Sequence, residues 1–225
     1  MAKDKYFDRF QKLCINILAQ SDNCQESQNM FRAAKSVPEL VQAWQRFWAG
    51  VLHEVPEQVI AAFGELYPVY RADIIRAGLY YNEAPVTPDG EPLMTGGLVL
   101  IGDRPVDGDS VAITISGRHR IYVLGDQPVI ITDNCSVNIN ADRANVELRG
   151  NARCNIEKGA VVARERSVVS GHGNITCYNS AIVSISGGTL TDHGHMRITA
   201  YGNAIVRSFT NRYITLNDNS KLYYE

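Results

Sequence analysis

The chain has 225 residues, of which 45% are hydrophobic and 20% charged, and these proportions exclude an intrinsically disordered protein. Lysine and arginine number 22 against 24 aspartate and glutamate, so the net charge of −2 gives no overall attraction to nucleic acid or to an anionic membrane. We therefore expect one large domain or two small ones, with neither nucleic acid nor a membrane as partner.

The beginning of the chain, Met1–Phe10, mixes acids and bases and lacks the apolar run of a secretory signal. Apolar runs such as Leu98–Ile101 are far too short to cross a bilayer. The irregular spacing of the cysteines, with no Cys-x-x-Cys pair, predicts neither a disulfide framework nor a zinc site. They are Cys14, Cys24, Cys135, Cys154 and Cys177. We expect a soluble protein of a reducing cytoplasm, without a cofactor.

Apolar residues recur at helical spacing from Asp4 to about Gly78. A clear helix start lies at Ser36–Glu39, where Ser is the N-cap, Pro stands in the first turn and Glu follows three residues after Ser. A further helix begins at Pro56 and is expected to break at Tyr67-Pro68. Gly78 is then expected to end the last helical segment.

An aromatic stripe, Trp44, Phe47 and Trp48, lies within the second of these segments. Aromatic side chains dominate the energetics of protein interfaces, so Trp44 and Trp48 are candidate partner contacts. A stripe of this width also commonly faces the core of a small helical unit. The sequence leaves both interpretations open.

After Glu83 the pattern changes from helix to strand. Turn signals such as Pro88-Asp89-Gly90 and Gly96-Gly97 separate short apolar runs. Further on, the motif small-x-apolar-x-apolar repeats at a step of eight, first over 144–148, 152–156 and 160–163. Each such octad is expected to be a short strand with alternate side chains inward, followed by a tight polar corner.

A longer period overlies the octads. Ile175–Val183 aligns with Ile198–Val206 at a shift of 23, and the same shift superposes Cys154 on Cys177 and His172 on His195. Three octads therefore predict one triangular coil, and stacked coils place equivalent residues in rows. About four coils are expected from Val129 onward.

These patterns predict an α+β fold with two domains. A small helical domain over residues 1–83 is followed by a three-faced, single-stranded parallel β-helix over 84–225. Transition strands occupy 97–132 and regular octads 133–225. Right-handed coiling is expected, because parallel crossovers are generally right-handed.

The runs Arg149–Ile156 and Tyr201–Ser208 resemble the tandem Gly-Asn-Ala-x-Val-x-Ala repeats of short-period β-solenoid proteins of bacteria and phages. The resemblance covers about the last 95 residues. It implies a fold and hardly any function, since such folds carry unrelated activities.

Candidate catalytic or metal-binding groups are few. His172 or His195 would be the counterpart of the histidine in hexapeptide acyltransferases, but the step here is eight rather than six. The motif Asp192-His193-Gly194-His195 has the composition of a metal site without an evident third ligand. Cys154 and Cys177 are expected to be packed, inert thiols. Acidic residues, which a carbohydrate enzyme would gather on one sheet, are scattered: Asp133, Asp142, Glu147, Glu157, Glu165, Asp192 and Asp218.

Two surface features are candidates for binding. Tyr178 and Tyr201, with Thr176 and Thr199, are expected to form an outward row suited to a sugar or a protein. The cluster Arg118-His119-Arg120 is either a small anion site or a solvated turn.

The solenoid end offers a third surface, because stacked parallel strands leave unpaired edges there. Tyr223 and Tyr224 at this end are candidate contacts for self-association. We therefore expect a structural or interaction protein that presents a rigid surface to a protein partner or to a second copy, without catalysis. The alternative is a carbohydrate-directed β-helix protein that uses the Tyr/Thr row.

Overall fold

A computed structural model describes residues 5–20, 25–54, 56–87, 89–105, 111–193, 197–209 and 213–224; inside the helices, the side chains of 17, 18, 20, 47–54 and 56–59 are not described. The chain divides into two compact units. The helical unit is residues 1–81 with 86–92, and the solenoid unit is residues 82–85 with 93–225. None of the described helices has an apolar stretch long enough to cross a bilayer.

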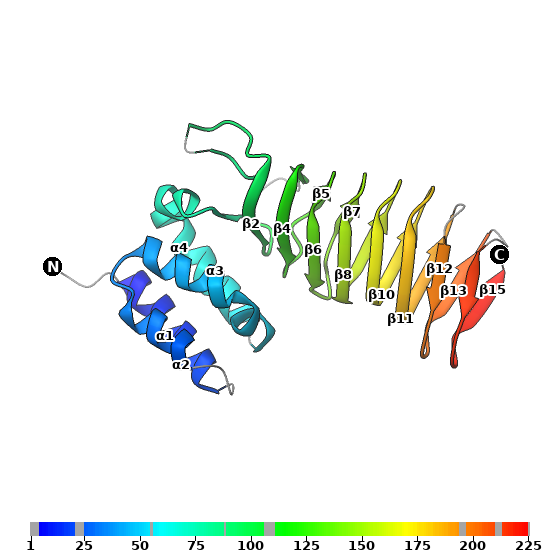
Figure 1. The fold of residues 1–225 in the computed structure, drawn as a ribbon, viewed down its shortest axis with the longest axis horizontal. Coiled ribbons are helices and arrows are strands. Elements are labelled where there is room, and N and C mark those ends of the chain that lie inside the picture. The colour runs from blue at the N-terminus through cyan, green and yellow to red at the C-terminus, as the bar shows by residue number, and fades with distance from the viewer. Residues whose placement is uncertain are drawn as a thin grey trace. The chain divides into compact units, whose positions relative to one another are not determined.

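The helical unit contains α1 (Lys5–Gln20), α2 (Gln25–Ala33), α3 (Val37–Glu54) and α4 (Pro56–Arg76), followed by the short strand β1 (Leu79–Tyr81) (Figure 1). The predicted start at Ser36 is confirmed, since the Glu39 backbone N–H donates to Ser36 Oγ at 3.5 Å. The Glu39 carboxylate in turn accepts the Lys35 backbone N–H at 2.8 Å. Helix α2 was not predicted.

The break expected at Pro68 is wrong in its position. Helix α4 continues through Pro68, and within its described length Tyr70 alone is non-helical, with φ −122° and ψ 23°, so the helix is kinked there. A proline lacks the N–H for the helical hydrogen bond and crowds the preceding turn, so it bends a helix without always ending it. The chain leaves the helix at Gly78, whose φ of +80° is the left-handed conformation of a C-terminal cap.

Three aromatic rings from three helices form the centre of the helical unit. The Trp44 ring of α3 lies 5.0 Å from Phe63 of α4 and 6.1 Å from Phe10 of α1, and the Phe10 and Phe63 rings lie 5.6 Å apart. All three side chains are buried. Trp44 therefore belongs to the core of this unit, as the second interpretation of the aromatic stripe predicted, and not to an exposed face. The Trp48 side chain lies outside the described residues.

The solenoid is built from two parallel series of paired strands, which we call face A and face B. Face A contains β2 (Thr95–Ile101), β4 (Arg118–Val123), β6 (Ser136–Asn140), β8 (Arg153–Lys158), β12 (Arg197–Ala200) and β14 (Ile214–Leu216). Face B contains β3 (Ile113–Ile115), β5 (Val129–Ile131), β7 (Val146–Leu148), β9 (Ala160–Ala163), β13 (Ile205–Ser208) and β15 (Lys221–Tyr224). The long strands β10 (Val168–Cys177) and β11 (Ile182–Asp192) run through both faces.

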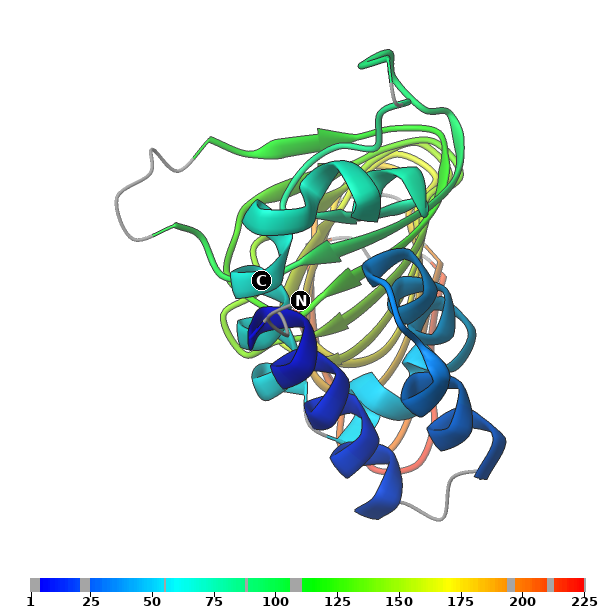
Figure 2. The same ribbon diagram turned by 90° about the vertical axis from the view of Figure 1, so that its left-hand side faces the viewer.

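The protein is thus an α+β protein with helices followed by a parallel β-solenoid of about eight turns in its described part. The strands lie side by side from β2 to β15 in Figure 1, and the coils superpose in the end-on view of Figure 2. The handedness of the coil stays a prediction.

The predicted three-faced coil is wrong. On face A, Val137 pairs with Cys154 and Cys154 with Val169; on face B, Val146 pairs with Val161. One coil therefore takes about two octads, and a shift of 23 residues spans about one and a half coils. The earlier alignment had equated a strand of face B with a strand of face A. Both faces carry the same inward pattern, so the octad alone does not distinguish two faces from three.

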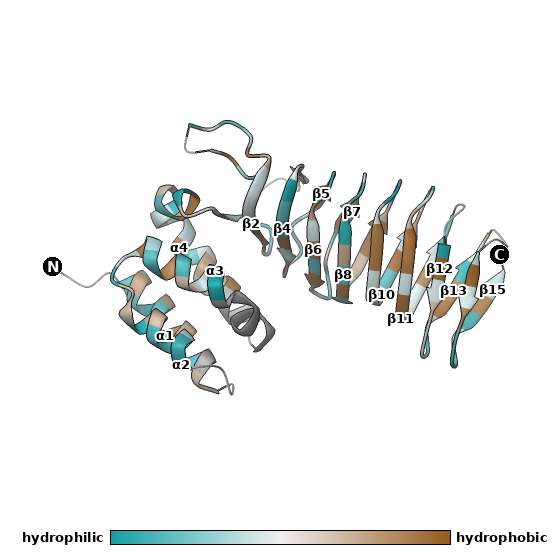
Figure 3. Cartoon of the chain, viewed as in Figure 1, coloured by the Kyte–Doolittle hydropathy of each residue, from teal (hydrophilic) through white to brown (hydrophobic). Residues whose placement is uncertain are grey.

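The inward positions carry the predicted apolar residues. Val183 and Ile198 on face A, and Ile175 and Leu190 on face B, are at most 1% exposed. Figure 3 shows apolar segments recurring on successive strands. Burial of these continuous rows is the main stabilising contribution of the solenoid.

A glycine lies at the bend of β10 between face A and face B. Gly171 has a φ of +122°, and a Cβ built on it would lie 1.9 Å from the Ile156 carbonyl oxygen. Only glycine fits this bend in the middle of β10, where the register also shifts.

Candidate functional site

On five successive coils, the residue directly after the face B segment of β7, β9, β10, β11 or β13 occupies the same place. These residues form what we call the corner row: Arg149, Arg164, Tyr178, His193 and Phe209. Backbone hydrogen bonds extend the strand pairing to this corner, with Tyr178 N–H donating to Ala163 O at 2.9 Å and His193 N–H to Cys177 O at 3.0 Å. The backbone therefore holds the row in register.

The side chains of the row stack on one another. The Arg164 Cζ lies 4.4 Å from the Tyr178 ring centroid, the Tyr178 and His193 rings are 5.0 Å apart, and the His193 and Phe209 rings are 4.9 Å apart. Interplanar angles of 13° and 18° make both ring pairs nearly parallel. These spacings match the roughly 4.8 Å between neighbouring strands. The faces of Tyr178 and His193 are consequently covered, and their edges remain for an external ligand.

One carboxylate joins the two arginines of the row. Glu147 Oε1 accepts hydrogen bonds from Arg149 Nε at 2.8 Å and from Arg164 Nε at 2.7 Å. Burial would raise the pKa of Glu147, but the hydrogen bonds and charges of the two arginines outweigh it and lower the pKa. The hydrogen bond to Glu147 raises the pKa of Arg149 above its usual value. The bridge is therefore charged at neutral pH.

The expected row of Tyr178 over Tyr201 does not form. Tyr178 follows a face B segment and Tyr201 follows β12 of face A, so the two lie at different corners. Thr176 pairs with Thr191 on face B, whereas Thr199 pairs with Ser184 on face A. The structure places only Tyr178 of these candidates in a stacked row, and its ring faces are not free for a sugar.

Asp192 and His193 of the candidate metal motif point to opposite sides, because side chains alternate along a strand. Asp192 points inward, is 0% exposed and accepts a hydrogen bond from Ser208 Oγ at 2.7 Å. His193 points outward into the corner row, and residues 194–196, which include His195, lie outside the described residues. Within the described ranges, no group of three or more His, Cys, Asp or Glu is placed to hold a metal ion.

The described cysteines are buried and free. Burial raises the pKa of Cys154 to about 12, and burial with the Asp192 charge also raises the pKa of Cys177. Their expected packing is confirmed, although Cys154 lies on face A and Cys177 on face B. Thiolate chemistry at neutral pH is therefore disfavoured at both.

Three of the scattered acids share one turn conformation, Asp133 and Glu165 after strands of face B and Asp218 after β14 of face A. Asp133, Glu165 and Asp218 have φ values of 60°, 58° and 57°. The carboxylates accept the backbone N–H groups of Gly117 at 3.1 Å, Gly150 at 2.6 Å and Gly202 at 3.1 Å, respectively. Each acid thus ties its turn to the turn one coil earlier. We call these three residues the corner carboxylates.

The cluster Arg118-His119-Arg120 lies in β4 and not in a turn. Both arginines are exposed, while His119 is 2% exposed. The Gly97 N–H donates to His119 Nδ1 at 3.1 Å, and His119 Nε2 donates to Leu93 O at 2.9 Å. His119 therefore anchors the beginning of β2 and is no part of a surface anion site.

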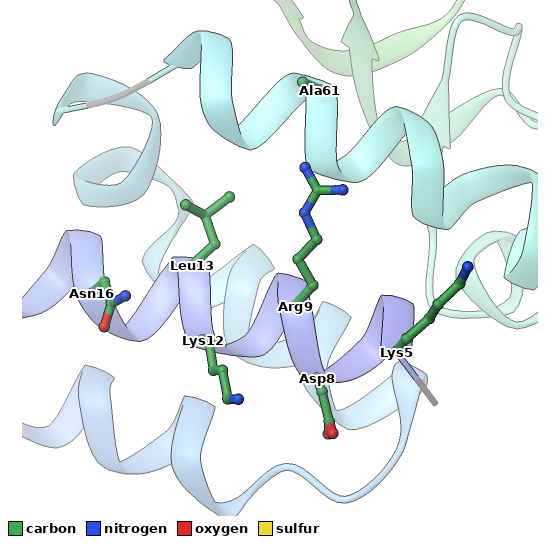
Figure 4. A pocket seen from close by; sticks show the side chains of 7 residues that line it. All are labelled: Lys5, Asp8, Arg9, Lys12, Leu13, Asn16 and Ala61. Carbon is green, nitrogen blue, oxygen red and sulfur yellow. The ribbon is translucent and has the colours of Figure 1, made fainter. Parts of the chain in front are cut away.

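A cavity of about 720 Å³ lies beside α1 and Ala61 of α4 in the helical unit (Figure 4). Arg9 and Leu13 point toward α4, whereas Asp8 and Lys12 point away from it. Arg9 also forms an ion pair with Glu65. The charged side chains do not converge, so this cavity is a weaker candidate site than the corner row.

Sequence reasoning missed His193, Phe209 and Arg164 as partners of Tyr178. Their positions are separated by 14 to 16 residues, which is the length of one two-face coil. This spacing predicts which residues become neighbours in the row. A period of 23 residues does not bring these positions together.

Together the fold and the corner row define a β-solenoid protein with a helical N-terminal unit and an ordered outward row. Comparison of the chain with protein-family models, with curated proteins and with solved structures finds no match.

Proposed function

We propose that the chain is a non-catalytic binding protein whose solenoid presents face B and the corner row to a protein partner. The observation that carries this proposal is the stacking and bridging within the row. Side chains that already hold one another in place lose little conformational entropy on binding. The row is therefore suited to be a preformed contact surface.

The outward side chains of face B support this choice over face A. Val162, Thr176 and Thr191 are uncharged and only partly exposed on consecutive coils of face B. On the same three coils of face A the outward side chains are more exposed, among them Arg153, Ser170 and Ile182, and the coil after them is charged on both faces through Arg197 and Arg207. The centres of protein interfaces are depleted of charge and enriched in aromatic residues and arginine, as in face B with its row.

A photo-crosslinking residue tests the proposal. Benzoylphenylalanine replaces Thr191 on face B or, as the matched control, Ser184 on face A, and each variant is expressed in the source organism. We expect a discrete protein adduct from position 191 and none from position 184. Absence of an adduct at 191, or equal adducts at both positions, would contradict the choice of face B.

Two other partners stay predictions. Self-association through the last coil would use Tyr223 and Tyr224, which are 50% and 62% exposed in β15; light scattering at high concentration tests it. Glycan binding at Tyr178 and Tyr201 would need two separate corners, and a glycan array with each tyrosine changed to alanine tests it.

We further propose a reducing cytoplasmic location and a bacterial or phage origin. Buried, free cysteines support the first, because such thiols persist in reducing compartments. The octad motif supports the second.

A further inference from the structure

We propose that Arg149 and Arg164 form a recognition site for an acidic segment of the protein partner, with a carboxylate bound between the two guanidinium groups. This inference rests on the proposed function and names the chemistry of the partner at the same surface.

Both guanidinium groups are oriented before any ligand arrives. Each donates its Nε–H to the same oxygen of Glu147, and Arg164 also packs against the Tyr178 ring. A guanidinium has five N–H donors. Within the described ranges, the terminal nitrogens of Arg149 and Arg164 have no hydrogen-bond partner, so two donor pairs remain on neighbouring coils. Paired forks of this kind match the two oxygens of a carboxylate.

The feature that would hold an anion is the pair of guanidinium forks on neighbouring coils. Arg149 and Arg164 are opposed by Glu147, which the two arginines share, and by Glu165, whose carboxylate accepts the Gly150 N–H at 2.6 Å, so these four charges balance. Both carboxylates already accept hydrogen bonds, whereas the terminal guanidinium nitrogens remain as donors. The Arg149 and Arg164 side chains are 44% and 38% exposed, so a partner can reach them.

An acidic peptide segment fits this site better than a free anion. A charge-balanced and partly exposed pair of arginines binds an inorganic anion weakly, because solvent screens the interaction. Val162, which pairs with Glu147 and Thr176 on face B, adds a partly buried apolar contact beside the arginines. A peptide with alternating acidic and apolar side chains can use both the charge and the apolar surface.

The test is a titration of the full-length, ¹⁵N-labelled protein, followed through the arginine Nε–Hε signals. The probe is the peptide Glu-Val-Glu-Val-Glu-Val, and the matched control is Gln-Val-Gln-Val-Gln-Val. We expect saturable shifts of the Arg149 and Arg164 signals with the acidic peptide only. Arg164→Lys is expected to weaken this binding by about tenfold, because lysine lacks the planar fork. Arg153→Lys, on face A, should leave it unchanged.

Three results would overturn the inference: no shift with the acidic peptide, an equal shift of Arg153, or equally tight saturation by sodium sulfate at matched ionic strength. The last result would assign the site to a free anion. A cross-link at position 191 without a shift of the Arg149 and Arg164 signals overturns this inference alone. A shift of these signals without a cross-link at position 191 overturns the proposed partner surface alone.

Discussion

At the scale of single residues, the corner carboxylates show how acids scattered in sequence acquire a common role. Asp133, Glu165 and Asp218 are each in the left-handed conformation and each bind a glycine N–H of the preceding coil. Aspartate tolerates this conformation better than most residues, and its side chain supplies the acceptor. These three residues stabilise turns, so their positions report how the coils stack.

Asp133→Ala is expected to lower the free energy of unfolding by about 1–2 kcal/mol, through the lost hydrogen bond and the poorer left-handed residue. Asp133→Asn keeps an acceptor and should cost less. Urea unfolding provides the measurement. Asp142→Ala is the control, since Asp142 is 79% exposed and pairs with Lys158 only at 3.5 Å. An equal loss from both alanine variants would refute the anchoring role.

His119 predicts a dependence of stability on pH. Burial lowers the pKa of His119 below its ordinary 6.5, against the opposing effect of hydrogen bonds to backbone carbonyls. The unfolded chain therefore binds the proton first as the pH falls, and stability that is present above about pH 6.5 is lost on acidification toward the lower folded pKa. Urea midpoints between pH 7.5 and 5 should fall more steeply for the wild type than for His119→Gln. His172→Gln, at an exposed position, should keep the wild-type slope, and parallel slopes for all three proteins would show that His119 is not the titrating group.

At the scale of elements, the corner row couples one coil to the next. The His193 ring contacts Tyr178 on one side and Phe209 on the other. Ring pairs in such geometry contribute about 0.5–1.5 kcal/mol beyond burial. A double-mutant cycle of His193→Ala and Phe209→Ala should therefore give a coupling energy in this range. The cycle of Tyr178→Ala with Tyr201→Ala is the control and should give none; coupling in the control alone would mean that the row is wrongly assigned.

Local patterns predicted the elements better than their assembly. The Ser36 cap, the Gly78 stop and the inward residues of the octads follow from hydrogen bonding and side-chain alternation, which are local. Helix α2 was not predicted, because its nine residues bury only Ser27 and Phe31, too few to give an apolar stripe at helical spacing. The position of the kink in α4, at Tyr70 and not at Tyr67-Pro68, did not follow from the proline alone.

At the scale of the whole solenoid, the number of faces was not predictable from the octad. A strand of face A and one of face B have the same small-x-apolar-x-apolar sequence, since both bury alternate residues in one shared core. The two-face and three-face coils differ in which outward residues become neighbours on adjacent coils. The contact of Tyr178 with His193 is one that the two-face coil produces. Of the candidate site, Tyr178 was predicted from the alternation of inward and outward residues, while its neighbours required the coil length.

The two-face coil predicts which deletions the solenoid tolerates. Removing Val168–Ala181 joins Ser167 to Ile182, the register equivalent of Val168, and so removes one complete coil. We expect this variant to fold and melt cooperatively, because each coil contacts only its neighbours. Removing the octad 168–175 shifts later strands by half a coil and should abolish cooperative melting followed by circular dichroism. Equal tolerance of both deletions would contradict the two-face coil.

The most direct measurement of the coil, on which the corner row depends, is disulfide formation between engineered cysteines. Neighbouring coils are about 4.8 Å apart, within the Cα separation of about 4.4–6.8 Å that a disulfide allows. The account predicts that Tyr178→Cys with His193→Cys oxidises readily in the folded protein, as identified by mass spectrometry, and that Tyr178→Cys with Tyr201→Cys does not. A cross-link between positions 178 and 201, with none between 178 and 193, would contradict it.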